Sequence, residues 1–353
     1  HNPLTGWVLY ASMGVDAADF WAQYDHMYIP ELGHNVSVTD YAHTLYIRAS
    51  WTDFNPQEDV YGWKIDSNLR AYIEGAYQRN MRLAFRVVVD SRDKRTEFTP
   101  QFVKDAGAKG FMNKGKWSPY SDDSVFQKYY TKFVKALAKD FNDPSKVEFI
   151  DGFGLGKWGE YHTMIYSTGD DTPKKAVFDW VTDIYSQAFD KVPVVINYHR
   201  WIGAGKDWVD DEHFAADSEE MLEEAIKKGY SLRHDAFGMT TYYGSWERRF
   251  AKKYRNICPI IMEGGWIVKS HSYWQDPRGY RKDSHEDVRR GEFDDSKEAH
   301  VNMMDFRFGD TESWFKDAFD LVRRFLREGG YRLYPSEISL PLEVSKKTTP
   351  TIK

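Results

Sequence analysis

Short apolar runs alternate along the chain with longer segments in which apolar residues recur at helical spacing. Runs rich in Val, Ile, Leu, Phe and Tyr predict buried strands, and apolar positions at i, i+3 and i+4 predict helices that cover them. The predicted strands span residues 7–11, 44–49, 83–89, 149–155, 193–197, 236–243, 259–263 and 300–306. The predicted helices span residues 66–79, 124–141, 174–190, 218–228 and 312–328, with Asp66, Ser124 and Ser218 as candidate N-caps.

This alternation predicts an α/β fold, a (β/α)8 TIM barrel over residues 1–330, with an open doubly wound sheet as the alternative. The number of strands favours the barrel, and no predicted strand leads into a glycine-rich phosphate-binding turn. The stretch GFGLGKWG at 152–159 has the glycines of such a turn, but Glu-Tyr-His follows it instead of an amphipathic helix. We therefore do not expect nucleotide binding there.

The chain changes character after the last predicted helix. Gly329 and Gly330 end that helix, and the alternating stretch YRLYPSEISLPLEV, interrupted by prolines, predicts one or two edge strands. Residues 331–353 are expected to form a β-strand extension. It is either the start of a C-terminal β-sandwich or a structured extension packed on the barrel.

Composition narrows the possible partners. Aromatic residues make up 16% of the 353 residues, with 13 Trp and 23 Tyr, more amphipathic rings than a core needs. Some should line a surface or cleft, where sugar rings are natural partners and a protein interface is the alternative. The net charge of -6 and the dispersed Lys and Arg residues argue against nucleic acid. No apolar run is long enough to predict a membrane span.

Other sequence features bear on metals and location. The lone Cys258 excludes a disulfide framework and a Cys-based zinc site, and no His pair at i, i+4 stands beside a carboxylate. We expect no metal and no cofactor. The first residues, HNPLTGW, contain neither an initiator Met nor a signal peptide, which suggests a processed chain. A secreted, periplasmic or cell-surface location is therefore expected.

Polar and aromatic residues follow the predicted strands at the ends that would meet at one rim of the barrel, where barrel enzymes place their chemistry. They are Arg48, Ser50, Trp51, Asp90, Arg92, Trp158, Glu160, Tyr161, His162, Asn197, Tyr198, His199, Arg200, Tyr242, Tyr243, Trp246, Glu263, Trp266, Asp305 and Arg307.

Two carboxylates in this set have unusual surroundings. Glu263 ends the apolar run of CPIIMEGGW, and Glu160 follows the fourth predicted strand beside Trp158 and Gly159. Burial at a strand end would raise the pKa of Glu160 toward that of a general acid. Two such Glu residues across a barrel mouth form the pair that retaining glycosidases use. The alternative for each is a solvated or ion-paired residue of the rim.

These residues carry a resemblance to clan A of the glycoside hydrolases, the retaining (β/α)8 enzymes. A Glu after strand four and a Glu ending strand seven match that clan. The stretch YIRASWTDFNPQEDVYGWKID is similar to its second βα unit through Arg48, Trp51, Pro56, Tyr61 and Trp63. The resemblance covers roughly residues 5–330.

The resemblance implies that Glu160 is the acid/base and Glu263 the nucleophile. Most members carry Asn immediately before the acid/base, whereas this chain has Gly159 in a WGE motif, as in a divergent bacterial branch. The hydrogen bond from that Asn to the sugar 2-OH then comes from elsewhere or is absent.

Further residues are candidates for binding the substrate. Arg48 would lower the pKa of Glu263, unless it forms an ion pair of the barrel core. One of Tyr242 and Tyr243 should face inward and hydrogen-bond the nucleophile, because strand residues alternate. The remaining candidates are Trp51, Trp158, Trp246 and Trp266 as sugar platforms or core residues; Asn197, His199 and His162 as polar groups of the mouth; and Asp90 and Asp305, which would bind hydroxyls or hold Arg side chains. The segments 91–122 and 267–299 should shape the subsites.

We predict a retaining glycoside hydrolase that acts on a poly- or oligosaccharide. A non-catalytic carbohydrate-binding protein on the same barrel is the first alternative. A barrel that uses both Glu residues for a lyase or isomerase reaction on a sugar is the second.

Overall fold

Eight parallel strands form a closed barrel in the computed structural model, and each strand pairs with its neighbours in chain order until β12 pairs with β1. The predicted (β/α)8 barrel is confirmed, and the open-sheet alternative is excluded. The structure describes residues 4–92, 94, 96–206, 212–239, 242–266, 285–307, 309–330, 338–339 and 351–352. The barrel strands are β1 (Gly6–Tyr10), β4 (Ala42–Ser50), β5 (Arg82–Val88), β8 (Val147–Asp151), β9 (Val194–Asn197), β10 (Ser231–Phe237), β11 (Ile260–Gly264) and β12 (Met303–Asp305).

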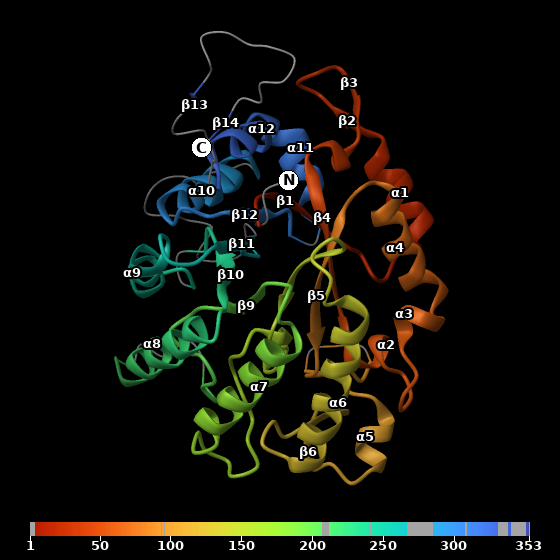
Figure 1. Ribbon diagram of the computed structural model, residues 1–353, viewed down its shortest axis with the longest axis vertical. Coiled ribbons are helices and arrows are strands. Elements are labelled where there is room, and N and C mark those ends of the chain that lie inside the picture. Colours follow the sequence, from red (N-terminus) through yellow and green to blue (C-terminus); the bar gives the residue numbers. More distant parts are fainter. Residues whose placement is uncertain are drawn as a thin grey trace.

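Helices surround the barrel, and Figure 1 shows the chain running round it from β1 in red to β12 in blue. Antiparallel hairpins extend two of the loops, a feature that the apolar pattern does not predict. The main helices are α1 (Ala17–Asp25), α4 (Ser67–Gln78), α6 (Ser124–Phe141), α7 (Lys174–Ala188), α8 (Glu212–Lys227), α9 (Ser245–Tyr254), α10 (His285–Glu298), α11 (Thr311–Asp317) and α12 (Phe319–Glu328). Shorter helices are α2 (Trp51–Phe54), α3 (Gly62–Ile65) and α5 (Gln101–Asp105), and the hairpins are β2 (Met27–Ile29) with β3 (His34–Val36) and β6 (Gly110–Asn113) with β7 (Lys116–Pro119).

Two strand predictions need correction. The sixth strand is β10, so the prediction of 236–243 was wrong for most of its length. The residues of β10, SLRHDAF, include Arg, His and Asp, which interrupt the apolar pattern. The overlapping stretch AFGMTTYY at 236–243 has the apolar pattern expected of a strand. The fourth strand, β8, ends at Asp151, four residues before the predicted end at Leu155. Glu160 therefore lies in the loop after β8, not at the strand end itself.

Helix boundaries also differ in places from the prediction. Asp66 caps α4 as expected, with its carboxylate accepting from the Leu69 amide. Asp123, not Ser124, caps α6. Ser218 lies inside α8, where its hydroxyl accepts from the amide of Ile202, so it is not a cap. The single predicted helix 312–328 is split into α11 and α12 around residue 318.

The core has two apolar layers separated by the sheet. A small cluster inside the barrel includes Val8, Tyr46, Phe149 and Ile261. The larger cluster lies between the strands and the helices, and includes Trp7, which is 0% exposed and stacks on Phe306 with ring centroids 4.4 Å apart. These layers fix the strand ends, so the rim positions that carry the polar side chains are rigidly supported.

The C-terminal segment contains the short strands β13 (Ile338–Ser339) and β14 (Thr351–Ile352), which pair antiparallel. The rest of the predicted extension 331–353 lies outside the described residues, so the choice between a sandwich and a packed extension stays a prediction. Among the helices of the described residues, we find none whose length and hydropathy suit a bilayer-spanning segment.

Candidate active site

A cavity of about 640 Å³ opens at the carboxyl ends of the barrel strands. Its wall combines residues at the ends of β1, β4, β10 and β11 with residues from the loops that follow the strands. Lining residues are Tyr10, Ala11, Met13, Gly14, Arg48, Ala49, Ser50, Asp53, Val88, Lys94, Phe98, Trp158, Glu160, Asp235, Ala236, Met239, Tyr242, Glu263, Trp266 and Arg307. The cavity thus has carboxylates at its base and several aromatic rings in its wall.

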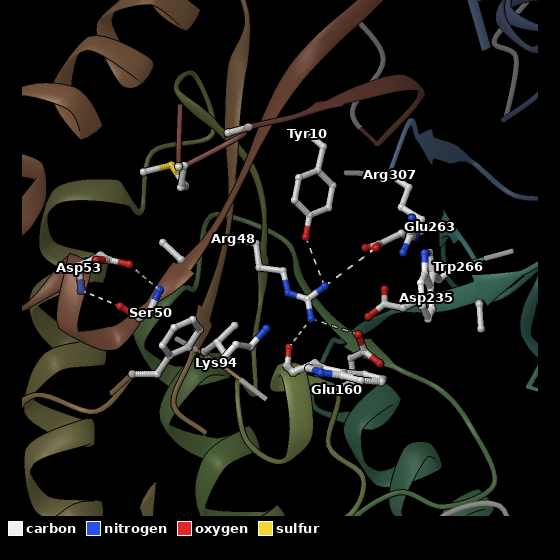
Figure 2. A pocket seen from close by; sticks show the side chains of 18 of the residues that line it. Tyr10, Arg48, Ser50, Asp53, Lys94, Glu160, Asp235, Glu263, Trp266 and Arg307 are labelled. Atoms are coloured by element: carbon white, nitrogen blue, oxygen red, sulfur yellow. Dashed lines mark hydrogen bonds and ion pairs between the residues drawn. The ribbon is translucent and has the colours of Figure 1, made fainter. Parts of the chain in front are cut away.

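Arg48 lies between the two Glu residues singled out by the sequence, as Figure 2 shows. Its Nη2 is 3.1 Å from Oε1 of Glu160, and its Nη1 is 4.0 Å from Oε1 of Glu263. Nη2 also donates to the carbonyl of Trp158 at 2.5 Å, and Nη1 donates to the hydroxyl of Tyr10 at 3.3 Å. One planar guanidinium therefore contacts both carboxylates at the same cavity.

A second guanidinium, that of Arg86 on β5, lies beneath the cavity and is fully buried. Its Nε donates to Oδ2 of Asp151 at 2.8 Å, and its Nη1 donates to Oδ2 of Asp235 at 2.5 Å. Nη1 also lies 3.9 Å from Oε1 of Glu160. Arg86 thus links the carboxylate that ends β8 to two carboxylates of the cavity wall.

Arg233 on β10 is the third guanidinium, and it too is fully buried. Its Nε donates to Asp235 at 2.8 Å, and its Nη2 donates to Glu263 at 2.5 Å and to Asp305 at 2.6 Å. Glu263 and Asp305 are register partners on β11 and β12, so a single Nη2 reaches both. Arg233 therefore holds Glu263 from below while Arg48 contacts it from the cavity.

These side chains form what we call the charged cluster. It comprises Arg48, Arg86, Arg233, Asp151, Glu160, Asp235, Glu263 and Asp305. Five carboxylates face three guanidiniums, so the cluster would carry two more negative than positive charges if every group were ionised. Because buried like charges repel strongly at low dielectric, this excess favours the retention of a proton on one of the carboxyls.

The pKa directions of the two Glu residues are opposite to those expected from the sequence. Burial raises the pKa of Glu263 to about 8, and the nearby carboxylates of Asp305 and Asp235 add to this effect against Arg233 and Arg48. Burial also opposes the charge on Glu160, but the hydrogen bond from His162 and the charge of Arg48 outweigh it, and the net pKa is lowered. In the ligand-free site Glu263 is thus the protonated carboxyl and Glu160 the ionised one.

The raised pKa of Glu263 predicts a pH dependence of stability. The folded protein holds this proton up to about pH 8, whereas a Glu carboxyl in the unfolded chain loses it near pH 4.5. This contribution to the free energy of unfolding therefore falls as pH rises. Burial lowers the pKa of His199 from 6.5 to about 3. The contribution of His199 to stability therefore increases with pH, but only up to about pH 6.5. Between about pH 6.5 and 8, wild-type stability should fall with a slope approaching about 1.4 kcal/mol per pH unit.

Urea unfolding at several pH values checks this. The difference in free energy of unfolding between wild type and Glu263→Gln should change across that window, because the variant has no carboxyl to titrate. A pH-independent difference between the two proteins would contradict a raised pKa for Glu263.

The loop that carries Glu160 has a constrained backbone. Trp158 and Tyr161 have positive φ values of 60° and 61°, which non-glycine residues seldom adopt. Gly159 has φ +75°, and a Cβ there would lie 3.3 Å from Cγ2 of Val88. A side chain at position 159 would therefore be strained by the left-handed backbone and would crowd Val88. The strain marks this loop as one that its surroundings hold in place.

Two histidines lie beside the loop, and each contacts Glu160 through its Nε2 atom. His162 Nε2 is 3.3 Å from Oε2 of Glu160. His199 Nε2 donates to the carbonyl oxygen of Glu160 at 2.8 Å, and its Nδ1 accepts from the Trp201 amide at 3.2 Å. Both contacts fix the neutral tautomer of His199, in agreement with its lowered pKa. The backbone and the side chain of Glu160 are therefore each held by a histidine.

The structure brings most of the predicted binding residues to the mouth. Arg48, Trp158, Tyr242 and Trp266 line the main cavity. His162, Asn197 and His199 line a smaller adjoining cavity. Trp266 is 55% exposed at the mouth of the main cavity.

Five candidate binding residues line neither cavity, and the structure favours the alternatives given for them. Trp51 is 0% exposed and packs among core rings, including Tyr130 at a centroid distance of 5.1 Å. Trp246 stacks on Phe250 at 5.1 Å. Tyr243 is buried and pairs with the hydroxyl of Tyr198. Asp90 and Asp305 hold Arg92 and Arg233, as the alternative for these two residues proposed, and neither lines the cavity.

Tyr242 and Tyr243 follow β10 instead of lying on it, so strand alternation does not decide which of them faces inward; Tyr242 lines the cavity together with Glu263. Tyr10 at the end of β1 accepts a hydrogen bond from Arg48 in the same cavity. Sequence reasoning also missed Arg86, Arg233 and Asp235. An Arg inside the apolar run LAFRVVV was a signal for Arg86, because a charge in a buried strand needs a partner. The misplaced sixth strand concealed the other two.

Part of segment 91–122 lines the cavity through Lys94 and Phe98, as predicted. Of the second predicted wall, α10 is described, and residues 267–284 lie outside the described residues.

The sequence matches no protein-family model and no curated protein. The fold, however, is similar to solved glycoside hydrolases. A xylanase from Paenibacillus barcinonensis, complexed with a conduramine derivative, is 7% identical, with a TM-score of 0.50 over 85% of this chain and 83% of that one. An intracellular xylanase from Thermoanaerobacterium saccharolyticum, in complex with xylotriose, is 8% identical, with a TM-score of 0.52 over 85% of each chain.

Endo-glycoceramidase II from Rhodococcus sp., in a cellobiose-like imidazole complex, is 13% identical, with a TM-score of 0.51 over 95% of this chain and 82% of that one. At these identities the comparisons establish a shared barrel fold.

Proposed function

We propose that the chain is a retaining glycoside hydrolase whose catalytic pair is Glu160 and Glu263. The observation that carries this proposal is the Arg48 guanidinium, which contacts both carboxylates at the carboxyl end of one barrel. Opposite protonation states of the two carboxyls are what glycoside hydrolysis needs, because one group must give a proton while the other remains an anion. The charged cluster supplies one carboxyl of each kind.

The roles follow the resemblance stated above. In the first displacement, Glu160 donates its proton to the glycosidic oxygen as the bond from C1 to that oxygen breaks. A carboxylate oxygen of Glu263 attacks C1 and forms a glycosyl ester. In the second, ionised Glu160 takes a proton from water, the water oxygen attacks C1, and Glu263 leaves as carboxylate. Before the first step, the proton held by Glu263 must pass to Glu160, on the other side of Arg48.

The wall of the cavity supports a carbohydrate as the ligand. Trp158, Trp266, Tyr10 and Tyr242 contribute rings on which the apolar face of a sugar can stack. Ser50 and Asp53 add polar groups beside them. A cavity of about 640 Å³ also falls in the range that small-molecule sites occupy.

A second candidate function is a non-catalytic carbohydrate-binding protein. The lowered pKa of Glu160 favours it, because an ionised Glu160 cannot protonate a leaving group. In this case the same rings and carboxylates bind a sugar, and no covalent step follows.

A glycan-panel digest tests the proposal. Wild type is expected to release product from at least one aryl glycoside or oligosaccharide, whereas Glu263→Gln releases none above background. Glu74→Gln is the matched control, because Glu74 is exposed and pairs only with Arg70 among the ion pairs described. Equal product from wild type and Glu263→Gln would contradict the proposal. Sugar binding by folded wild type without any product would favour the binding function.

A further inference from the structure

A second, smaller cavity adjoins the main one beside Glu160. Its volume is about 30 Å³, room for one water-sized group. It shares four lining residues with the main cavity and reaches from there toward β9 and β10. The shared residues are Glu160, Asp235, Ala236 and Tyr242. A ligand in the main cavity could therefore extend one small substituent into this side pocket.

Two residues that line the side pocket each have a buried polar atom with no hydrogen-bond partner among the described residues. These atoms are Oδ1 of Asn197, the last residue of β9, and Nε2 of His234 on β10. Both side chains are 97% buried, so bulk water does not satisfy them. An unpaired buried polar atom costs about 1–3 kcal/mol, so two of them in one pocket indicate a partner that completes it.

The hydrogen bonds of the two side chains fix what that partner must offer. His234 Nδ1 accepts from the Ala236 amide at 3.0 Å, so the proton of the neutral ring is on Nε2, which is a donor. Burial lowers the pKa of His234 and keeps the ring neutral. Asn197 Nδ2 donates to Oδ2 of Asp235 at 3.4 Å, so Oδ1 is the atom free to accept. The pocket thus presents one donor and one acceptor.

We propose that Asn197 and His234 form a clamp for one unsubstituted hydroxyl of the substrate sugar, next to the bond that is cleaved. A hydroxyl accepts from Nε2 of His234 and donates to Oδ1 of Asn197 at the same time. A carboxylate or sulfate has no proton to donate and would meet the negative charges of Asp235 and Glu160. An acetamido or O-acetyl group is larger than the pocket. The substrate class is therefore a sugar with a free hydroxyl at this position.

The clamp rests on the proposed function, because it assumes that a sugar occupies the main cavity. A β-bulge supports the placement of His234. The pairing of β10 with β11 shifts register between His234 and Phe237, and such a shift redirects side chains at a strand end. Asn197 and Arg233 are register partners on the adjacent strands β9 and β10, and His234 is the residue that follows Arg233.

Monodeoxy sugars test the clamp by a double-mutant cycle. The substrate is the aryl glycoside that wild type cleaves in the panel, together with its four forms that each lack one hydroxyl. For one deoxy position, kcat/KM of wild type should fall about 10- to 100-fold more than that of Asn197→Ala, which has already lost the contact. The cycle cancels the intrinsic reactivity of each deoxy sugar, and the other positions serve as internal controls.

Two variants of His234 sharpen the test. His234→Phe retains a ring without a donor and should lose the coupling, whereas His234→Gln has an amide N–H near the position of Nε2 and should retain part of it. Coupling below twofold at every hydroxyl, with wild type active, would overturn the clamp and leave the proposed function standing.

If wild type cleaves no glycoside, the clamp is tested without turnover. Protein carrying ¹⁵N-labelled histidine is titrated with the methyl glycosides of glucose, mannose, galactose and xylose up to their solubility. A shift of the His234 Nε2 signal in wild type and its absence in Asn197→Ala would support the clamp while the hydrolase proposal fails. No shift with any of the four would overturn the clamp.

Discussion

Replacing Glu160 with alanine is expected to slow the hydrolysis of glycosides with poor leaving groups by about 10²- to 10⁴-fold, the range that general acid–base catalysis contributes. The first step on a 2,4-dinitrophenyl glycoside should be nearly unaffected, because that leaving group departs without a proton. Added azide should restore turnover, since azide attacks the glycosyl ester without a base, and the glycosyl azide should have retained configuration. Stopped-flow kinetics and NMR of the product measure both effects.

The matched variant is Glu263→Ala, which removes the nucleophile and leaves the rest of the charged cluster in place. It should be slow on every substrate, on the order of 10⁴-fold, and azide should give a product of inverted configuration. In the ligand-free site Glu263 is the protonated carboxyl and Glu160 the ionised one, so the main alternative is that Glu263 is the acid/base and Glu160 the nucleophile. Leaving-group dependence and a retained azide product in Glu263→Ala, not in Glu160→Ala, would show that the two roles are exchanged.

The barrel was predictable because its signals are local. Seven of the eight barrel strands are short apolar runs, and an apolar run can be recognised from its own residues alone. The candidate carboxylates followed from the same reasoning. Parallel strands of a barrel end at one rim, so the sequence alone could group Glu160 with Glu263. What the sequence could not show is that Arg48 lies between them.

The misplaced sixth strand has a physical cause, which is burial of charge. Strand β10 contains Arg233 and Asp235, and these two charges make it look like a loop. They are tolerated inside the barrel because each is the partner of the other. Pairing between distant residues is invisible to a local pattern, and so are the pKa directions, which depend on the carboxylate excess of the whole cluster. The same limit explains Trp51, whose core contacts come from α6.

The buried Arg233 is the centre on which the charged cluster depends. Its side chain is 0% exposed and lies within 4.0 Å of four carboxylates, those of Asp151, Asp235, Glu263 and Asp305. Removing one partner of a buried ion pair leaves an uncompensated charge, which costs about 3–5 kcal/mol. Here the loss would leave several carboxylates facing one another, so the effect should be at the upper end of that range.

Arg233→Met is therefore expected to lower the free energy of unfolding by about 3–5 kcal/mol at pH 7, as measured by urea denaturation. Because Arg233 lowers the pKa of Glu263 and Asp305, its loss raises both in the folded state. Folded carboxyls with raised pKa hold protons that the unfolded chain releases, so the deficit of the variant should shrink as the pH falls from 8 toward 5. Arg70→Met, which removes an exposed pair with Glu74, is the matched control and should change stability by less than about 0.5 kcal/mol.

A double variant separates the charge effect from the loss of packing. Asp235 is an ionised partner of Arg233, because Arg86 and Arg233 outweigh its burial and hold its pKa low. Arg233→Met combined with Asp235→Asn removes this carboxylate, so it should be more stable at pH 7 than Arg233→Met alone, by roughly 1–3 kcal/mol. If the deficit came from the altered shape of the barrel interior, the second substitution would add to the damage instead. A pH-independent deficit with additive double-variant behaviour would therefore show that Arg233 acts as a space-filling side chain and not as the counter-charge of the cluster.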